Sequence, residues 1–268
     1  MVQEGCIKVG AVSFLNTKPL IQPILDNQVF NIDLTLDVPS KIADDFRIGT
    51  LDVALIPIIE YFRCSDYLIL PEISISSRGA VKSIRIFSRK PISECQTIAL
   101  DTSSRTSRVL TQIVLAEKYN VYPSFVDCPP TVNLESVETD AVLLIGDSAL
   151  RNIGSTEFEV DLGAVWHDLF ELPFVYACWV TRYNTDLGDL PQLLKKAKHI
   201  GIDQVQSIAS IESRKLGLSR SLCEDYLRNY IYYDLGPQEI EGMTLFYDLA
   251  IKHNHVPAGN QIRFTLMK

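Results

Sequence analysis

The sequence lacks the segments that carry a protein across or into a membrane. Its opening stretch, MVQEGCIKVGAVSF, has no basic run followed by a long apolar core and a small-residue cleavage site, as a secretory signal requires. No apolar run approaches the roughly 20 residues that span a bilayer, and DAVLLIG is short enough to be a buried strand. We therefore expect a cytoplasmic protein with no membrane partner.

Positive charge is also in short supply. Lys and Arg total 25 against 33 Asp and Glu, which gives a formal net charge of −8. A protein that binds nucleic acid usually presents a basic face, so this composition argues against such a partner. A small anion is still compatible with the charge if local donors such as helix N-termini, hydroxyls and amides hold it.

The sequence shows neither the spacing of a metal site nor a familiar catalytic signature. The six cysteines form no CxxC pair and favour buried, reduced thiols, and the four histidines have no matching ligand spacing. There is no GxSxG elbow, Walker A loop, GxGxxG fingerprint or HExxH motif. We interpret His167, in the segment WHDL, as a structural or exposed residue rather than a general base.

What the sequence does contain is an alternation of short apolar strands and amphipathic helices. Its 268 residues suffice for two lobes, each with a core of its own. The alternation predicts largely parallel sheets covered by helices. Strands are expected at 7–14, 32–38, 53–58, 80–88, 97–101, 124–126, 141–145 and 174–181, and helices at 15–26, 41–48, 59–63 and 105–119.

From Leu190 onward the chain changes to three expected helices, at 191–215, 219–232 and 237–253. A helical tail after strand units is typical of a chain that crosses into a second lobe and returns. We predict one lobe from residues 1–88 and 178–268, a second from residues 89–177, and a ligand cleft between them. Such a cleft lies at the carboxyl ends of strands and the N-termini of helices.

Three places along the chain set polar side chains beside or within strands, where a cleft ligand can reach them. Ser13 and Asn16 follow the first strand, and Asn16 either contacts a ligand or caps the next helix. Ser83 interrupts an apolar strand and needs a hydrogen-bond partner, either a ligand or the backbone. Asp147 follows the strand at 141–145 and suits either cleft chemistry or a turn.

The segment at residues 102–107, TSSRTS, is the richest in polar groups. It places five hydroxyls and one guanidinium directly before and within a helix start. Exposed N–H groups at a helix start, together with hydroxyls, favour a carboxylate or phosphate cradle, although ordinary capping also explains them. Asp101 precedes this segment and opposes an anion, so we expect it to be tied to the backbone or to Arg105.

Several segments, in this order, resemble the chorismate dehydratases of the futalosine-type menaquinone pathway. They are VGAVSFLNTKPL, DVPSKIADDFRIGTLDVALIPIIEYF (37–62), ISSRGAVKSIRIFSRKPI (75–92), IALDTSSRTSRVL (98–110), DAVLLIGDSAL (140–150) and DLGAVWHDLFELPFVYACW (161–179). The resemblance covers nearly the whole chain, more loosely in the helical tail. Phe14 stands where tyrosine is also common, and ELP at 171–173 stands where TGLP is usual.

The resemblance implies an α/β, two-lobed, periplasmic-binding-protein-like (type II) fold. It has mixed, mostly parallel sheets with helices on both faces and a helical C-terminal tail. It also implies a reaction without cofactor or metal, in which chorismate loses water to give 3-[(1-carboxyvinyl)oxy]benzoate. The alternatives are a small-anion binding protein without catalysis and the related dihydroxynaphthoate-forming enzyme.

The resemblance further implies roles for individual residues. Asn16 and Ser83 are expected to be catalytic by holding carboxylate and hydroxyl groups of chorismate. Thr106 and Ser107 are expected to form a second carboxylate cradle, with Ser13 and Asp147 as further substrate contacts. Because no His, Lys or Glu stands in the matching motifs as an obvious base, we expect the substrate's own side-chain carboxylate to accept the proton.

Overall fold

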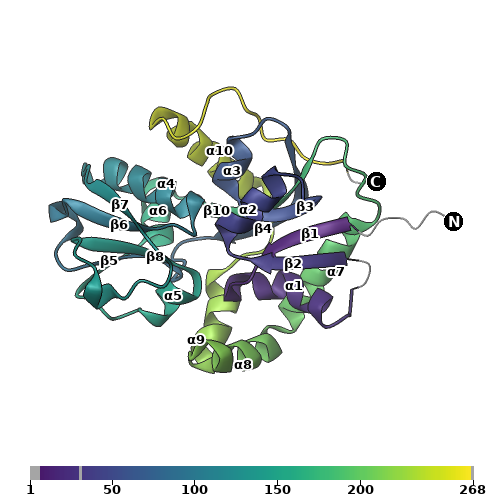
Figure 1. Ribbon diagram of the computed structural model, residues 1–268, viewed down its shortest axis with the longest axis horizontal. Coiled ribbons are helices and arrows are strands. Elements are labelled where there is room, and N and C mark those ends of the chain that lie inside the picture. Colours follow the sequence, from purple (N-terminus) through teal and green to yellow (C-terminus); the bar gives the residue numbers. More distant parts are fainter. Residues whose placement is uncertain (1–6, 30–31, 267–268) are drawn as a thin grey trace.

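Two five-stranded sheets with helices on both faces make up the protein (Figure 1). The computed structural model describes residues 7–29 and 32–266. The first sheet has the strand order β2-β1-β3-β10-β4 and consists of β1 (Ile7–Val12), β2 (Ile32–Asp37), β3 (Val53–Pro57), β4 (Tyr67–Ser77) and β10 (Phe174–Arg182). The second has the order β7-β6-β8-β5-β9 and consists of β5 (Ile84–Ser88), β6 (Thr97–Asp101), β7 (Ser124–Cys128), β8 (Ala141–Ile145) and β9 (Phe158–Asp161).

The two sheets share one topology. In the first, β1 pairs in parallel with β2 and β3, whereas β10 runs antiparallel to both β3 and β4. In the second, β6 pairs in parallel with β7 and β8, whereas β5 runs antiparallel to both β8 and β9. A single strand in each sheet therefore opposes the others, and the expected mixed, mostly parallel character is confirmed.

The antiparallel strands β5 and β10 are each the first strand after the chain passes from one sheet to the other. The strand β5 was expected in the lobe made of 1–88 and 178–268, but it pairs with β8 and β9 of the second sheet. The strand β10 belongs to the first sheet from its start at Phe174. The turn at 89–91 was mistaken for a lobe boundary because its RKP sequence is typical of a connection, and here it joins two strands of one sheet. We propose lobe crossings at about 78–83 and 171–173.

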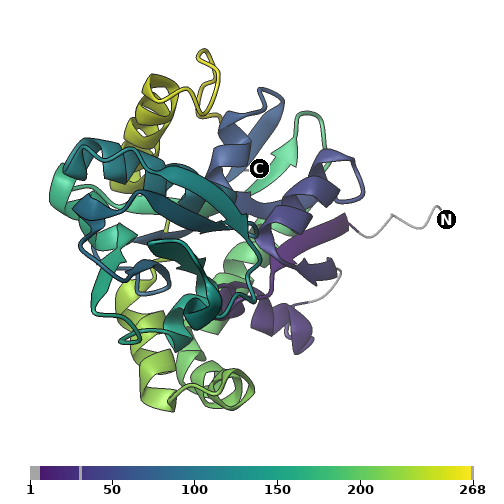
Figure 2. The same ribbon diagram turned by 60° about the vertical axis from the view of Figure 1, so that its left-hand side comes forward.

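Helices cover each sheet, and the helical tail returns to the first one. In both views α8 and α9 form the lower edge and α10 lies at the upper edge (Figures 1 and 2), and α1 packs against α7 and α8. The expected helix at 191–215 is divided into α7 and α8. The helices are α1 (Lys18–Leu25), α2 (Pro39–Arg47), α3 (Ile58–Phe62), α4 (Arg105–Val114), α5 (Gly146–Arg151), α6 (Leu162–Phe170), α7 (Leu190–Asp203), α8 (Val205–Leu216), α9 (Arg220–Asp225) and α10 (Pro237–Lys252), with short 3-10 turns η1 (Leu15–Thr17), η2 (Ile92–Glu94) and η4 (Leu134–Ser136) and π-turns η3 (Leu115–Tyr119) and η5 (Tyr226–Tyr230).

An aromatic cluster joins α6 to the first sheet. Trp166 of α6 lies 4.9 Å from Phe174 of β10 and 6.1 Å from Phe246 of α10, measured between ring centroids. The rings of Phe174 and Phe246 lie 4.9 Å apart. All three side chains are buried, so their apolar surface and their edge-to-face packing stabilise the placement of α6 against the first sheet.

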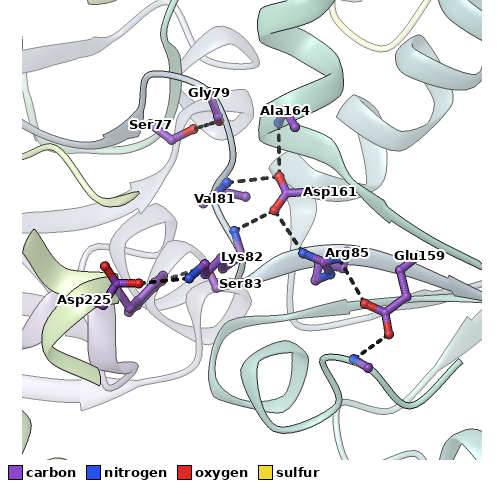
Figure 3. A network of polar contacts seen from close by, with 12 residues as sticks. Ser77, Gly79, Val81, Lys82, Ser83, Arg85, Glu159, Asp161, Ala164 and Asp225 are labelled. Carbon is purple, nitrogen blue, oxygen red and sulfur yellow. Dashed lines mark hydrogen bonds and ion pairs between the residues drawn. The ribbon is translucent and has the colours of Figure 1, made fainter. Parts of the chain in front are cut away.

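One carboxylate, that of Asp161 at the end of β9, holds the first crossing (Figure 3). Its Oδ1 accepts hydrogen bonds from the N–H groups of Val81 at 3.0 Å and of Ala164 at 3.1 Å. Its Oδ2 accepts from the N–H of Lys82 at 2.7 Å and pairs with the Arg85 guanidinium at 3.3 Å. Lys82 has a φ of 60°, which non-glycine residues rarely adopt. Asp161 therefore both caps α6 and fixes a strained turn in the crossing.

Two helix glycines allow close contact with the crossings. A Cβ built on Gly163 of α6 would lie 2.6 Å from the carbonyl oxygen of Gly79, in the first crossing. A Cβ on Gly242 of α10 would collide with the carbonyl oxygen of Pro173, in the second. Both contacts are with backbone, which cannot rotate away as a side chain can. The relative placement of the two sheets therefore depends on these small residues.

Replacing Gly242 with alanine should destabilise the protein, because the new methyl group overlaps the Pro173 carbonyl. Overpacking of this kind lowers the free energy of unfolding by about 2 kcal/mol. Urea denaturation of Gly242→Ala and wild type measures the difference. Glu241→Ala, on an exposed position of the same helix, serves as the control and should stay close to wild type. Equal stability of Gly242→Ala and wild type would contradict the close packing.

Candidate active site

A cavity of ≈ 60 Å³ lies where the two sheets meet. Its walls include Val12 and Pro57, which end β1 and β3, and Ile145, which ends β8. Carboxyl ends of parallel strands from both sheets thus face one space, which is where α/β sheets bind ligands. The other lining residues are Phe14, Asn16, Thr17, Pro39, Ile75, Ser83, Ile84, Ser104, Thr106, Ser107, Gly146, Tyr176 and Ala177.

The lining of this cavity is apolar, hydroxyl-bearing and almost free of titratable groups. Among the described residues, those that line it include no Asp, Glu, His, Lys, Arg or Cys. Tyr176 is the exception, and burial raises the pKa of its phenol well above the ordinary value. The neutral phenol shares a hydrogen bond of 2.9 Å with Ser77 Oγ. Such a lining can bind and orient a polar ligand, but it offers no general base.

The start of α4 forms one wall. Ser104 caps the helix, and its Oγ accepts a hydrogen bond from the N–H of Ser107 at 3.2 Å. By helix geometry the N–H groups of Arg105 and Thr106 have no partner within the helix. Thr106 Oγ1 accepts from the N–H of Ile59 at 3.3 Å and donates to the carbonyl of Tyr176 at 3.4 Å. Thr106 therefore ties α4 to the first sheet, while the helix start faces the cavity.

Asn16 faces the cavity from the first sheet, and two neighbours hold it. The hydroxyl of Tyr233 donates to the Asn16 backbone carbonyl at 3.0 Å. Thr17 Oγ1 donates to Asn16 Oδ1 at 3.2 Å. The Asn16 side chain does not cap α1, because no side-chain cap is present at that helix start. Of the two interpretations left open by the sequence, the geometry thus favours a ligand-facing amide.

Ser83 faces the cavity from the first crossing, directly before β5. Its backbone N–H donates to the carbonyl of Val81 at 2.7 Å, and its carbonyl accepts from the N–H of Gly146 at 2.7 Å. Its Oγ accepts a hydrogen bond of 2.7 Å from the hydroxyl of Tyr226. The side chain is buried, so the partner that a buried hydroxyl needs is supplied by Tyr226, a residue of the helical tail.

Asp147 and Ser13 lie beside the cavity rather than in its wall. Asp147 Oδ1 accepts a hydrogen bond of 3.0 Å from the backbone N–H of Leu15, which links α5 of the second sheet to η1 of the first. Burial raises the pKa of the Asp147 carboxyl. Ser13 is exposed, and its N–H donates to the carbonyl of Asp37 at 3.2 Å. Both remain proposed substrate contacts only through the resemblance.

The predicted anion-binding segment includes the Arg105 guanidinium. In the structure this guanidinium forms ion pairs with two carboxylates instead. It pairs with Asp44 of α2 at 2.8 Å and with Glu60 of α3 at 3.0 Å. Hydrogen bonding to Arg105 lowers the pKa of Asp44. Asp101 is bound by the N–H of Ser103 at 2.8 Å and by its hydroxyl at 2.6 Å, so it is tied to its own turn and not to Arg105. Arg105 instead clamps α4 to the first sheet.

His167 stands apart from the cavity. It lies on α6, and its buried Nδ1 has no hydrogen-bond partner among the described residues. In residues 7–29 and 32–266, no cluster of three His, Cys, Asp or Glu side chains that could hold a metal ion occurs. Within the same ranges, no helix is long and apolar enough to cross a membrane.

Two tyrosines of the site were not expected. Tyr176 lies within the apolar run of β10, where a tyrosine reads as core. Tyr226 begins the π-turn η5, far along the chain from Ser83. The insertion of an extra residue in a π-turn often marks a functional position, but it leaves no readable pattern in the sequence.

Comparison with known proteins relates nearly the whole chain to one family. A family model described as menaquinone biosynthesis matches residues 7–252. A chorismate dehydratase from Thermus thermophilus is 29% identical over 78% of this chain and 83% of the relative. A chorismate dehydratase from Campylobacter jejuni is 25% identical over 88% of this chain and 94% of the relative. The similarity includes every segment that lines the cavity.

Solved structures confirm the expected fold class. A protein from Archaeoglobus fulgidus superposes with a TM-score of 0.76 at 15% identity, over 93% of this chain and 98% of the other. A Candida albicans protein described as having the generic periplasmic binding protein fold superposes with a TM-score of 0.65 at 12% identity, over 98% and 99%. At these identities the likeness concerns the fold alone, and the fold is periplasmic-binding-protein-like.

Replacing Asp147 separates its charge from its hydrogen bond to Leu15. Asp147→Asn keeps an acceptor for the Leu15 N–H, whereas Asp147→Ala leaves that buried donor unpaired and should lower the free energy of unfolding by about 1–3 kcal/mol. The pKa of Asp147 is raised in the folded protein, so its contribution to stability is greatest at low pH and declines as pH rises through the folded pKa. As pH rises above the ordinary range of an aspartate carboxyl, wild type should therefore lose stability relative to Asp147→Asn. Denaturant titrations at several pH values test this, and parallel curves would contradict it.

Proposed function

The chain belongs to the menaquinone-biosynthesis family, and we propose that it is a chorismate dehydratase, a lyase that removes water from chorismate to give 3-[(1-carboxyvinyl)oxy]benzoate. Two relatives that bear the name chorismate dehydratase support this, as they match most of the chain. The proposal includes a cytoplasmic location, as expected for a biosynthetic enzyme that acts on a small soluble acid.

The observation that carries the proposal is the composition of the cavity wall. It combines hydroxyls, an amide and a helix start with apolar surface, and among the described residues it contains no acid or base able to titrate near neutral pH. The residues of this wall thus supply donors and apolar surface rather than a proton acceptor. Such a wall suits a substrate that carries its own base and needs only to be held in one conformation.

Chorismate meets this requirement. The hydrogen on the carbon that bears the enolpyruvyl ether is activated by the conjugated ring carboxylate. In the proposed reaction this proton passes to the substrate's side-chain carboxylate, and the C–O bond of the neighbouring hydroxyl breaks. The proton and the hydroxyl together make up the released water, and the ring becomes aromatic. Aromatisation supplies the driving force, so the protein needs to orient the substrate and stabilise developing charge.

The proposed roles follow from which groups face the cavity. The start of α4, with the N–H groups of Arg105 and Thr106 and the Ser107 hydroxyl, suits a carboxylate because the helix dipole is positive there. Asn16 and Ser83 approach from the first sheet and from the crossing, and they suit the hydroxyl and the other carboxylate. The two sheets thus contribute different donors, so lobe closure completes the site.

Incubation with chorismate, followed by liquid chromatography and mass spectrometry, tests the activity directly. The expected product is lighter by one water and has an aromatic ultraviolet spectrum. Asn16→Leu keeps the side-chain size but loses its polar groups, and it should lower kcat by about 100-fold, as does the loss of an oriented donor elsewhere. Ser83→Ala should act in the same direction. Ser155→Ala, an exposed serine, is the control. Chorismate returned unchanged by folded wild type would reject the activity and leave a binding role.

A cavity wall whose described residues include no base predicts a flat pH profile. The substrate's carboxylate is ionised above about pH 5, and burial keeps the pKa of Tyr176 well above its ordinary value, so kcat should stay constant from about pH 6 to about pH 9. Steady-state kinetics across this range measure the profile. A step within this range would instead indicate that a titrating group of the protein takes part in the reaction.

A further inference from the structure

Two consecutive residues of the first crossing are bound by two consecutive residues of the helical tail. Lys82 Nζ pairs with Asp225 at 3.0 Å (Figure 3), and Ser83 Oγ accepts from the Tyr226 hydroxyl at 2.7 Å. Lys82 Nζ also lies 3.8 Å from the centre of the Tyr230 ring. The helical tail therefore binds the first crossing at Ser83, which lines the cavity, and at the residue before it.

The Tyr226–Ser83 hydrogen bond is shielded from water. Both side chains are 1% exposed. Burial raises the pKa of the Tyr226 phenol, so it stays protonated and able to donate. The interactions of Tyr226 with the side chains of Ser83 and, to a smaller extent, Asn16 oppose this rise in pKa but do not cancel it. Tyr226 thus contacts both residues that the proposed function makes catalytic, although it does not itself line the cavity.

The direction of this hydrogen bond determines what Ser83 can do. A serine hydroxyl has one hydrogen to donate and two lone pairs to accept with. Tyr226 occupies a lone pair, and within the described part of the chain it is the one hydrogen-bond partner of Ser83 Oγ. The Ser83 hydrogen is therefore available to a ligand, and Ser83 lines the cavity.

We propose that Tyr226 is a positioning residue, whose hydroxyl donates to Ser83 Oγ and so directs the Ser83 hydrogen toward the substrate. This rests on the proposed function. With Tyr226 in place, Ser83 acts as a donor to substrate oxygen and is prevented from donating back into the protein. A donor oriented before the reaction stabilises charge as it develops, without reorganising at that moment.

Tyr226→Phe removes the phenol oxygen and keeps the ring, so it tests the proposal. We expect kcat to fall about tenfold when Ser83 is free to turn, a change equivalent to about 1.4 kcal/mol and within the range for an oriented hydrogen bond. KM should stay within about twofold, since the α4 contacts are untouched. Tyr61→Phe is the matched control. Tyr61 is buried, donates to the carbonyl of Gln261 at 2.9 Å and does not line the cavity, so this variant should lose stability but keep kcat per folded molecule.

A second comparison shows whether Tyr226 acts through Ser83. Rates are measured with enzyme in excess over chorismate, so that slow variants remain measurable. Adding Tyr226→Phe to Ser83→Ala should change the rate by less than about twofold, because the group that Tyr226 orients is already gone. A further tenfold loss would show another route of action and overturn the proposal.

The remaining outcomes separate this proposal from the function on which it rests. An active wild type with an equally active Tyr226→Phe overturns the positioning role and leaves the dehydratase intact. A drop in kcat that matches a drop in folded fraction, as thermal unfolding reports, also overturns it. A folded wild type that does not convert chorismate rejects the function, and the positioning role with it.

Discussion

The rest of the structure depends on the carboxylate of Asp161. It accepts two backbone N–H groups of the crossing and one from α6, and it pairs with the Arg85 guanidinium. A neutral asparagine could not replace Asp161. Its amide has one acceptor oxygen, whereas four donors converge on the carboxylate. The Lys82 turn that Asp161 stabilises has an unfavourable φ, and the surrounding hydrogen bonds offset that strain. The next residue after this turn is Ser83, so the position of a proposed catalytic hydroxyl is set by a contact outside the cavity.

Both sheets repeat one topology, and this repetition explains why the site lies between them. In each sheet the central parallel strands end at the same edge, and the antiparallel strand is the one made as the chain changes sheets. Groups that line the cavity therefore come from equivalent positions, η1 after β1 and the start of α4 after β6. Arg105, with its two carboxylate partners in the first sheet, and Asp147, with the Leu15 N–H, join these positions across the boundary.

The sequence predicted the strand and helix alternation and the helical tail, because each rests on local apolar periodicity or on capping residues. Polar residues near strands and at a helix start also pointed to Asn16, Ser83, Thr106 and Ser107, which line the cavity, whereas their roles toward a substrate stay predictions. It did not predict β4, in which Pro71 and Glu72, with a φ of 68°, interrupt the strand pattern and the pairing with β10 shifts register. It placed β5 in the wrong sheet because strand pairing is a long-range property. The Tyr226–Ser83 and Arg105–Glu60 contacts join residues far apart in the chain, and no spacing rule reveals them.

The described cavity wall contains no acid or base that titrates near neutral pH, so the fold has to supply oriented hydrogen-bond donors instead. In the proposed function, a binding protein and a dehydratase on this fold would use the same helix start for a carboxylate, and the reaction requires no added titratable group if the substrate provides the base. What distinguishes them is then the direction of neutral donors such as Asn16 and Ser83. Behind the wall, the Tyr226 hydroxyl donates to Ser83 Oγ and the Tyr233 hydroxyl donates to the Asn16 backbone carbonyl, and both tyrosines belong to the helical tail. The helical tail, remote in sequence from every cavity motif, thus holds the two residues that we propose to be catalytic.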